Sequence, residues 1–85
     1  MTEKLYYLDA YIKEFDAEII SITPVESGYQ VVLDKTAFFP EEGGQRSDSG
    51  RIGAARVIHV YESEGVIYHV TDSDPGLGKC HCILD

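Results

Sequence analysis

Three polar side chains in a glycine-rich segment of this 85-residue sequence could contact a ligand: Thr36, Gln45 and Asp48. The Thr36 hydroxyl and the Gln45 amide can each donate and accept hydrogen bonds. Gly43 and Gly44 directly precede Gln45 and permit positive φ, so the bend can hold the Gln45 amide pointing inward. Neutral groups of this kind position or select a substrate, but neither can activate water by itself.

The same segment contains residues that would shape a loop. Pro40 fixes one backbone angle, and Asp48 stands before Ser49 and Gly50, where its carboxylate could close an Asx-type turn. We therefore interpret Pro40, Gly43, Gly44, Asp48 and Gly50 as loop-shaping residues. A crossover loop between two sheets, with no ligand, would also need such residues, and from chemistry alone that alternative stays open.

Three histidines and two cysteines are the other candidates for chemistry. His59, His69 and His81 fall on three different predicted strands, and the apolar neighbours of His59 and His69 favour an outward orientation for both rings. Cys80 and Cys82 share a strand face from which His81 points away, so a Cys-His-Cys strand cannot present three ligands together. We expect no metal site and no catalytic residue within this chain, and reduced thiols in Cys80 and Cys82.

The scaffold is predicted to be all β. Period-two alternation, β-branched residues and turn signals every 8–12 residues indicate a small closed or partly open barrel of five to six mostly antiparallel strands. A slip in the alternation at Ile19 and Ile20 suggests a β-bulge. The N-terminal arm, over residues 1–13, is expected to be irregular, with Tyr6, Tyr7 and Tyr11 covering one end of the core. The predicted strands cover 14–24, 29–34, 54–61, 66–70 and 78–84.

Composition restricts the possible partners. The formal net charge is −8, which argues against a general nucleic-acid binder. Residues 35–56 are the exception with a net charge of +1, whereas residues 1–34 carry −5 and residues 57–85 carry −4. No apolar run approaches the length of a membrane span, and the start of the chain does not resemble a signal peptide. We therefore expect a cytoplasmic protein with no membrane partner.

The loop also carries a family resemblance. Its pattern Thr36-x-Phe38-Phe39-Pro40-Glu41-x-Gly43-Gly44-Gln45-x-Ser47-Asp48-x-Gly50-x-Ile52 resembles the signature T-x-F-Y-P-E-G-G-G-Q-P-x-D-x-G of alanyl-tRNA synthetase editing domains and free-standing alanyl-tRNA editing proteins. The opening Leu5-Tyr6-Tyr7-x-Asp9-x-Tyr11 and the strand Val66-Ile67-Tyr68-His69-Val70 look similar to the same family. The sequence departs from the signature at three positions: Phe39 for tyrosine, Glu42 for the first glycine and Arg46 for proline.

The resemblance implies a translation-protein barrel that forms one wall of an editing cleft. In the family, a hydrolase clears serine or glycine wrongly attached to tRNA(Ala), and its zinc ligands lie in a following α/β part. The resemblance thus brings Thr36 and Gln45 as substrate-binding residues toward the acylated 3′ end of tRNA(Ala), and it brings no zinc ligand. It also implies a nucleotide-binding protein of translation.

On this interpretation, residues 1–85 are the single N-terminal barrel of an alanyl-tRNA editing protein whose zinc-bearing second domain is absent. The parent would be an aminoacyl-tRNA hydrolase related to alanine–tRNA ligase, and the fragment alone is expected to be inactive. Surface exposed by truncation could support a homodimer. Two alternatives stay open: a stand-alone barrel that binds a protein or small ligand through the loop, and a parent that is a complete synthetase.

Overall fold

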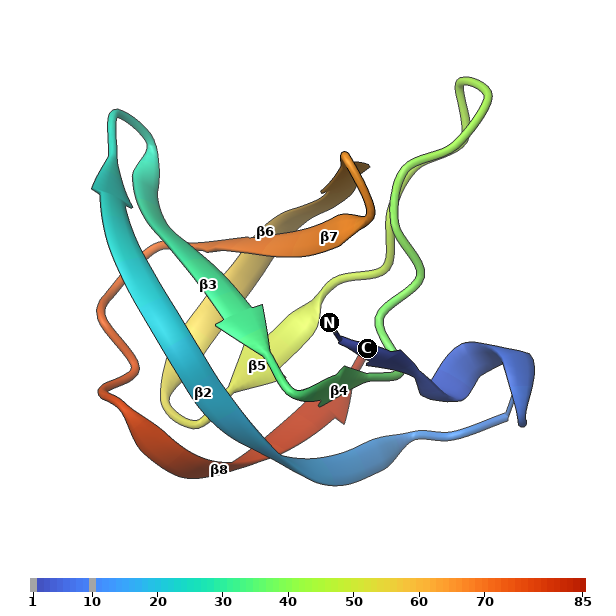
Figure 1. The fold of residues 1–85 in the computed structure, drawn as a ribbon, viewed down its shortest axis with the longest axis horizontal. Coiled ribbons are helices and arrows are strands. Elements are labelled where there is room, and N and C mark those ends of the chain that lie inside the picture. Colours follow the sequence, from blue (N-terminus) through green and yellow to red (C-terminus); the bar gives the residue numbers. More distant parts are fainter. Residues whose placement is uncertain (1, 10) are drawn as a thin grey trace.

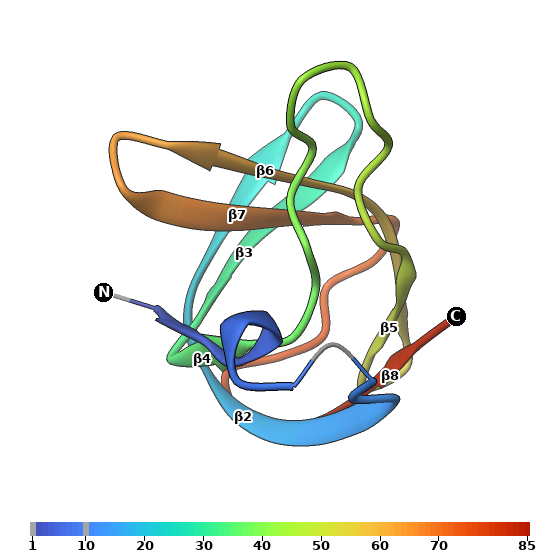
Figure 2. The same ribbon diagram turned by 90° about the vertical axis from the view of Figure 1, so that its right-hand side faces the viewer.

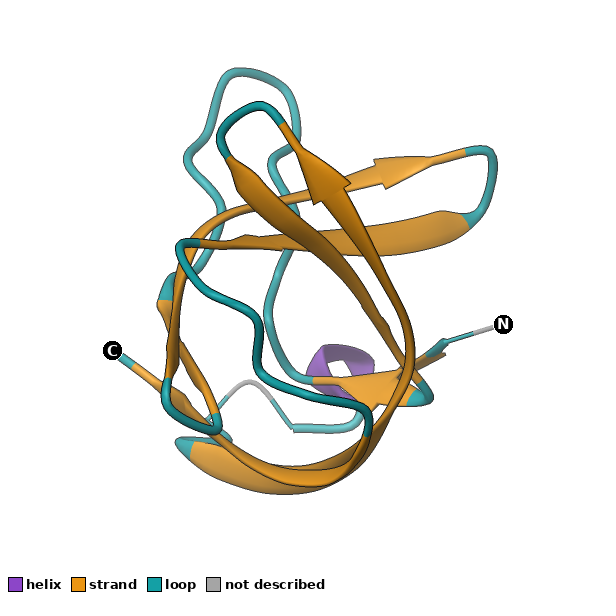
Figure 3. Ribbon diagram, turned by 90° about the vertical axis from the view of Figure 1, so that its left-hand side faces the viewer, coloured by secondary structure: helices purple, strands orange, loops and turns teal. Residues whose placement is uncertain are grey.

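The fold is a closed six-stranded β-barrel, seen in a computed structural model that describes residues 2–9 and 11–85. Figure 1 shows the chain winding around a common interior, and Figure 3 shows the strands in orange with the loops that join them in teal. Neighbouring strands run antiparallel in the order β2-β3-β7-β6-β5-β8, and β8 pairs with β2 to close the ring. The barrel strands are β2 (Glu14–Val25), β3 (Gly28–Leu33), β5 (Gly50–Ile52), β6 (Ala55–Ser63), β7 (Val66–Thr71) and β8 (Gly78–Leu84).

The sequence prediction of an all-β barrel is confirmed, and each of the five predicted strands coincides with a long strand of the structure. Three short strands were not predicted: β1 (Glu3–Lys4), β4 (Lys35–Thr36) and β5. β5 lies inside the segment interpreted as loop, and its three residues bridge β6 and β8. Strands of two or three residues are too short for an alternating pattern to identify them.

The expected bulge near Ile20 is present. Ile19 pairs with Leu33 and Ser21 pairs with Val32, so Ile20 is the extra residue on β2. A second shift in register, between Val57 and His59 on β6, was not predicted. The bulged residues, Ile20 on β2 and Ile58 on β6, are two of the large apolar side chains that remain exposed.

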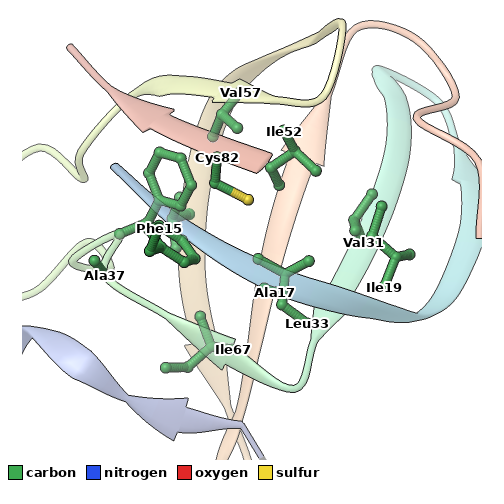
Figure 4. Close-up of a cluster of buried hydrophobic side chains, with 12 residues drawn as sticks. Phe15, Ala17, Ile19, Val31, Leu33, Ala37, Ile52, Val57, Ile67 and Cys82 are labelled. Carbon is green, nitrogen blue, oxygen red and sulfur yellow. The ribbon is translucent and has the colours of Figure 1, made fainter. Parts of the chain in front are cut away.

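The interior of the barrel is filled by inward-facing apolar side chains from all six strands and from the segment after β4. Phe38 lies across from Phe15, with ring centroids 5.7 Å apart in an edge-to-face arrangement. Figure 4 shows most of these side chains pointing toward one another between the strands. The cluster comprises Phe15, Ala17, Ile19, Val31, Leu33, Ala37, Phe38, Ile52, Val57, Val60, Ile67 and Cys82.

The N-terminal arm follows the prediction only in part; residues 1 and 10 lie outside the described residues. β1 pairs in parallel with β4, and a short 3-10 helix, η1 (Leu5–Tyr7), follows it. Tyr6 is partly buried against the core as expected. Tyr7 and Tyr11 are 71% and 85% exposed, so the prediction that they cover the core is wrong. η1 turns only Tyr6 of the adjacent pair toward the core, and the Tyr7 ring lies outside it, with Lys4 Nζ 5.8 Å from its centroid.

Candidate functional site

The glycine-rich segment forms a long loop between β4 and β5, called here the 36–50 loop. Figures 1 and 2 show it leaving the barrel wall beside η1, reaching outward and returning to β5. We distinguish its base, made by Thr36 and Phe38 together with His69 of β7, from its tip, made by residues 42–45. The arrangement separates two residues that the sequence analysis placed in one site, because Thr36 belongs to the base and Gln45 to the tip.

At the base, Thr36 is fully buried and its hydroxyl is engaged twice. Its Oγ1 lies 2.8 Å from Nε2 of His69 and accepts the backbone N–H of Phe38 at 3.0 Å. The parallel pairing of Lys4 with Thr36 fixes the backbone from the other side. Thr36 therefore does not present its hydroxyl to solvent in this structure.

His69 is the residue that the sequence analysis misplaced. It was expected on the outer face, but it is fully buried, with Nδ1 3.0 Å from the carbonyl oxygen of Val31. Both faces of β7 are apolar, so the neighbours Tyr68 and Val70 could not decide the orientation. The alternation of His69 with Ile67, which is also fully buried, was the signal that could have found it.

Burial governs the charge of His69. It lowers the pKa of the imidazole to about 4, against the upward effect of the hydrogen bond to Val31. The ring of Phe38 packs edge-on against the imidazole, with centroids 5.6 Å apart. Thr36 and His69 thus have the spacing of a nucleophile and a base. However, both side chains have zero exposed surface in the structure, so the pair is not assigned a catalytic role.

The middle of the loop is clamped by backbone-directed hydrogen bonds. Asp48 accepts the N–H of Phe39 through Oδ2 at 2.9 Å, and its own N–H donates to the carbonyl of Phe39 at 2.9 Å. Asp48 therefore closes the loop across nine residues, and not as the local Asx turn with Ser49 and Gly50 that was expected. The backbone N–H of Glu41 donates to the carbonyl oxygen of Val60 at 2.8 Å, and Ser47 Oγ accepts the N–H of Val60 at 3.0 Å. These two bonds tie the loop to β6.

At the tip, Gly43 and Gly44 have φ of +57° and +84°. Positive φ at both central positions is the signature of a type I′ turn. The N–H of Gln45 donates to the carbonyl of Glu42 at 3.0 Å, and the Gln45 side chain is exposed and not turned inward. Glu42 occupies the first position of this turn. Among the described non-glycine residues only Glu64 has positive φ, so the backbone at Glu42 does not require glycine.

Beside the loop lie two shallow hollows. One, of about 410 Å³, is lined by Arg46, Ser47, Ser49, His59, Glu41 and Ile58. Within it, Nε2 of His59 lies 3.2 Å from a carboxylate oxygen of Glu41, and the Arg46 side chain is exposed. The other, of about 280 Å³, lies between the N-terminal arm and the loop and is lined by Tyr6, Asp9, Ile12, Ala37, Phe39, Asp48 and Leu84.

The family resemblance implies zinc, and the donors of this chain do not fit it. Both ring nitrogens of His69 are within hydrogen-bond distance of Thr36 and Val31, and His81 is bonded to Asp16 at 2.8 Å. That bond raises the pKa of His81. Within residues 2–9 and 11–85, no group of three histidine, cysteine or acidic side chains is placed to hold a metal ion.

The two cysteines are free and share a face as predicted, with sulfur atoms 3.6 Å apart and His81 pointing away. Burial raises the pKa of both thiols. In the part of the chain that the structure describes, no helix is long and apolar enough to cross a membrane.

Comparison with known proteins identifies relatives along nearly the whole chain. Residues 3–80 match the family model described as "tRNA synthetases class II (A)". The chain is 46% identical over 82 residues to an alanine–tRNA ligase of Halorubrum lacusprofundi, covering 92% of this chain and 9% of the ligase. It is 44% identical over 75 residues to the alanyl-tRNA editing protein AlaX-M of Methanosarcina mazei, covering 81% of this chain and 29% of that protein. The chain therefore spans less than a third of the length of either relative.

Proposed function

The chain belongs to the family of class II (A) tRNA synthetases, and we propose that it is the barrel part of an alanyl-tRNA synthetase-like or alanyl-tRNA editing protein. In this role the barrel holds the acylated 3′ end of tRNA(Ala) beside the 36–50 loop. The wrongly attached amino acid would be serine or glycine. The reaction served is hydrolysis of the ester bond, in the cytoplasm where aminoacylated tRNA is used.

The observation that supports this proposal best is the anchoring of the 36–50 loop. The loop is fixed to the core by Thr36 and Phe38, closed by Asp48 and tied to β6 through Val60. A preorganised loop spends little binding energy on ordering when a ligand arrives. The exposed Gln45 amide then offers both a donor and an acceptor at its outer end.

The chemistry of ester hydrolysis exceeds what the described residues supply. It needs an activated water and stabilisation of a developing oxyanion. In this chain the neutral His69 and the hydroxyl of Thr36 are enclosed, and no side-chain group is placed to hold a metal ion among the described residues. We propose that the hydrolytic centre belongs to a further, zinc-bearing part of a longer protein, and that the barrel selects and positions the substrate.

The charge of the chain agrees with this division of labour. A net charge of −8 disfavours extended contact with the phosphate backbone of a tRNA body. Residues 35–56, which include the loop, carry a net charge of +1 and are the exception. The proposal therefore brings only the acylated terminus to the barrel.

The proposed role can be tested with non-hydrolysable analogues of the acylated terminus. The ¹⁵N-labelled chain would be titrated with 3′-seryl-amino-3′-deoxyadenosine, and amide shifts would be followed by NMR. We expect changes concentrated in the 36–50 loop and weaker ones with the alanyl analogue; adenosine alone is the control. Shifts spread over the far strands, or none at millimolar ligand, would count against the role.

Two further measurements address the isolated chain. We expect no deacylation of Ser-tRNA(Ala) above background, with or without added zinc, and turnover would contradict the division of labour. Exposed apolar side chains at the N-terminal arm and loop, Tyr7, Leu8, Tyr11 and Phe39, could pair two copies of the chain. Light scattering is expected to give a dimer mass, and a monomer mass would remove that part of the proposal.

A further inference from the structure

We propose that His69 is a positioning residue for Thr36. It holds the threonine hydroxyl with its proton directed at the imidazole, so that the Thr36 oxygen can only accept any additional hydrogen bond. His69 lies outside the loop motif, on β7. The assignment rests on the hydrogen-bond geometry of four neutral groups.

The tautomer of His69 follows from its partners. The carbonyl oxygen of Val31, 3.0 Å from Nδ1, can only accept, so Nδ1 must carry the proton. A neutral imidazole has one N–H, which leaves Nε2 as an acceptor. The partner of Nε2 at 2.8 Å is the Thr36 hydroxyl, and the hydroxyl must therefore be the donor.

The remaining capacity of the Thr36 oxygen is also fixed. Its single proton is given to His69, and one lone pair is taken by the N–H of Phe38 at 3.0 Å. One lone pair is left, and it can meet only a donor. A hydroxyl that rotated freely would have no such preference.

The surroundings keep the imidazole neutral and immobile. It is paired in the sheet with Val31 on β3 and Val60 on β6, and Phe38 packs against its ring with centroids 5.6 Å apart. None of these neighbours is charged. Burial lowers the pKa of His69 to about 4, so the ring stays neutral near pH 7.

A consequence for selectivity rests on the proposed function. An acceptor-only oxygen favours an aminoacyl group that brings a donor, such as the serine hydroxyl, over the methyl group of alanine. The Thr36 oxygen has no exposed surface in the structure, so contact with a ligand would require the loop base to open. The direction of the hydroxyl does not depend on this consequence.

The hydroxyl direction is tested by ¹⁵N NMR of the histidine rings at pH 7. In a long-range ¹H–¹⁵N spectrum of the full chain, we expect His69 to show a protonated Nδ1 and an unprotonated Nε2. His59 and His81, which are partly exposed, serve as internal references. A protonated Nε2, or an imidazolium at pH 7, would overturn the proposal without any variant being made.

Variants of Thr36 then test whether its hydroxyl is the donor to Nε2 of His69. Thr36→Ser keeps the hydroxyl and is expected to leave the Nε2 resonance close to that of the unmodified chain. Thr36→Val removes the donor and is expected to move the Nε2 resonance downfield while Nδ1 stays protonated. Gln45→Ala, at the loop tip, is the matched control and should leave both nitrogens unchanged. An unchanged Nε2 resonance in a folded Thr36→Val chain would contradict the assignment.

The expected selectivity for a seryl group is measured separately, with the seryl and alanyl analogues of the acylated terminus. We expect Thr36→Val to lose the preference for the seryl over the alanyl analogue, and Thr36→Ser to retain it. A preference that persists in Thr36→Val would remove the consequence for selectivity. If neither analogue binds the unmodified chain, the proposed function fails, whereas the tautomer result still stands or falls by itself.

Discussion

The base and the tip of the 36–50 loop come from one continuous motif but are held in different ways. The base is part of the core, where Thr36, Phe38 and His69 have no exposed surface and satisfy one another's hydrogen bonds. The tip is a glycine turn closed by backbone pairing between Glu42 and Gln45. A motif therefore does not mark one surface: part of it secures the loop, and part is free to meet a ligand.

The largest contrast is expected between two glycines. Gly50 ends the loop with φ of +156°, and a Cβ there would collide with the carbonyl oxygen of Ile83 on the neighbouring strand. Gly50→Ala should lower the free energy of unfolding by about 4 kcal/mol or more, enough to unfold a small domain. Gly44→Ala meets no atom within 4 Å and carries only the strain of positive φ, about 1 kcal/mol. Urea unfolding followed by circular dichroism measures the free energy of unfolding of both variants. Similar losses of stability in the two variants would contradict the expected difference.

The next largest effect is a pH dependence of stability that arises from His69 in the base of the loop. The pKa of His69 is about 4 in the folded chain, below the value of about 6.5 expected when unfolded. Between these values the unfolded state binds more protons, so the free energy of unfolding falls as the pH falls from 6.5 toward 4. The slope is at most ~1.4 kcal/mol per pH unit, and the total is about 3 kcal/mol.

The free energy of unfolding, measured at pH 7 and at pH 5, reports this effect, because both pH values lie above the titration range of most carboxylates. His69→Gln should flatten the dependence. The exposed His81 has a raised pKa and acts in the opposite direction, because its contribution is present at low pH and lost as pH rises. His81→Gln is therefore the control and should steepen the fall slightly. A wild-type slope that survives in His69→Gln would place the titrating group elsewhere.

A smaller contrast is expected between the two polar residues that the motif offers. Thr36→Val leaves the N–H of Phe38 and Nε2 of His69 without their partner inside the core, at a cost of about 1–3 kcal/mol. Gln45→Ala changes an exposed side chain and should stay within about 0.5 kcal/mol. Thermal unfolding of both variants measures the two losses of stability. A large loss of stability in Gln45→Ala would show that the tip also contributes to folding.

The smallest effect is expected at Glu42, where the family signature has glycine. Because its backbone φ is not positive, glycine offers no relief of strain at this position. Glu42→Gly should lower stability by less than about 1 kcal/mol through the greater freedom of the unfolded chain. The matched comparison is Glu64→Gly, at φ of +51°, which should raise stability instead. A gain at Glu42 equal to that at Glu64 would mean that the tip is strained.

Much of the barrel could be predicted from local pattern. Alternating β-branched residues identify the five long strands, and the slip at Ile20 identifies a bulge. The short strands β1, β4 and β5 could not be predicted, because two or three residues carry no period and exist only through their partners. The loop motif singled out Thr36, Gln45 and Asp48, but not which of them is buried.

The sequence by itself determined the fold class, the family and the position of the loop, because these depend on periodicity and on an ordered string of residue types. Only the tertiary structure decided that His69 faces the core, that its ring meets Thr36 across 33 positions and that Asp48 reaches back to Phe39. The contact of His69 with Thr36 joins segments distant in sequence that the closing of the barrel brings together, whereas the contact of Asp48 with Phe39 depends on how the loop folds back on itself. The physical reason is that a strand with apolar residues on both faces fixes neither orientation until its neighbours are in place.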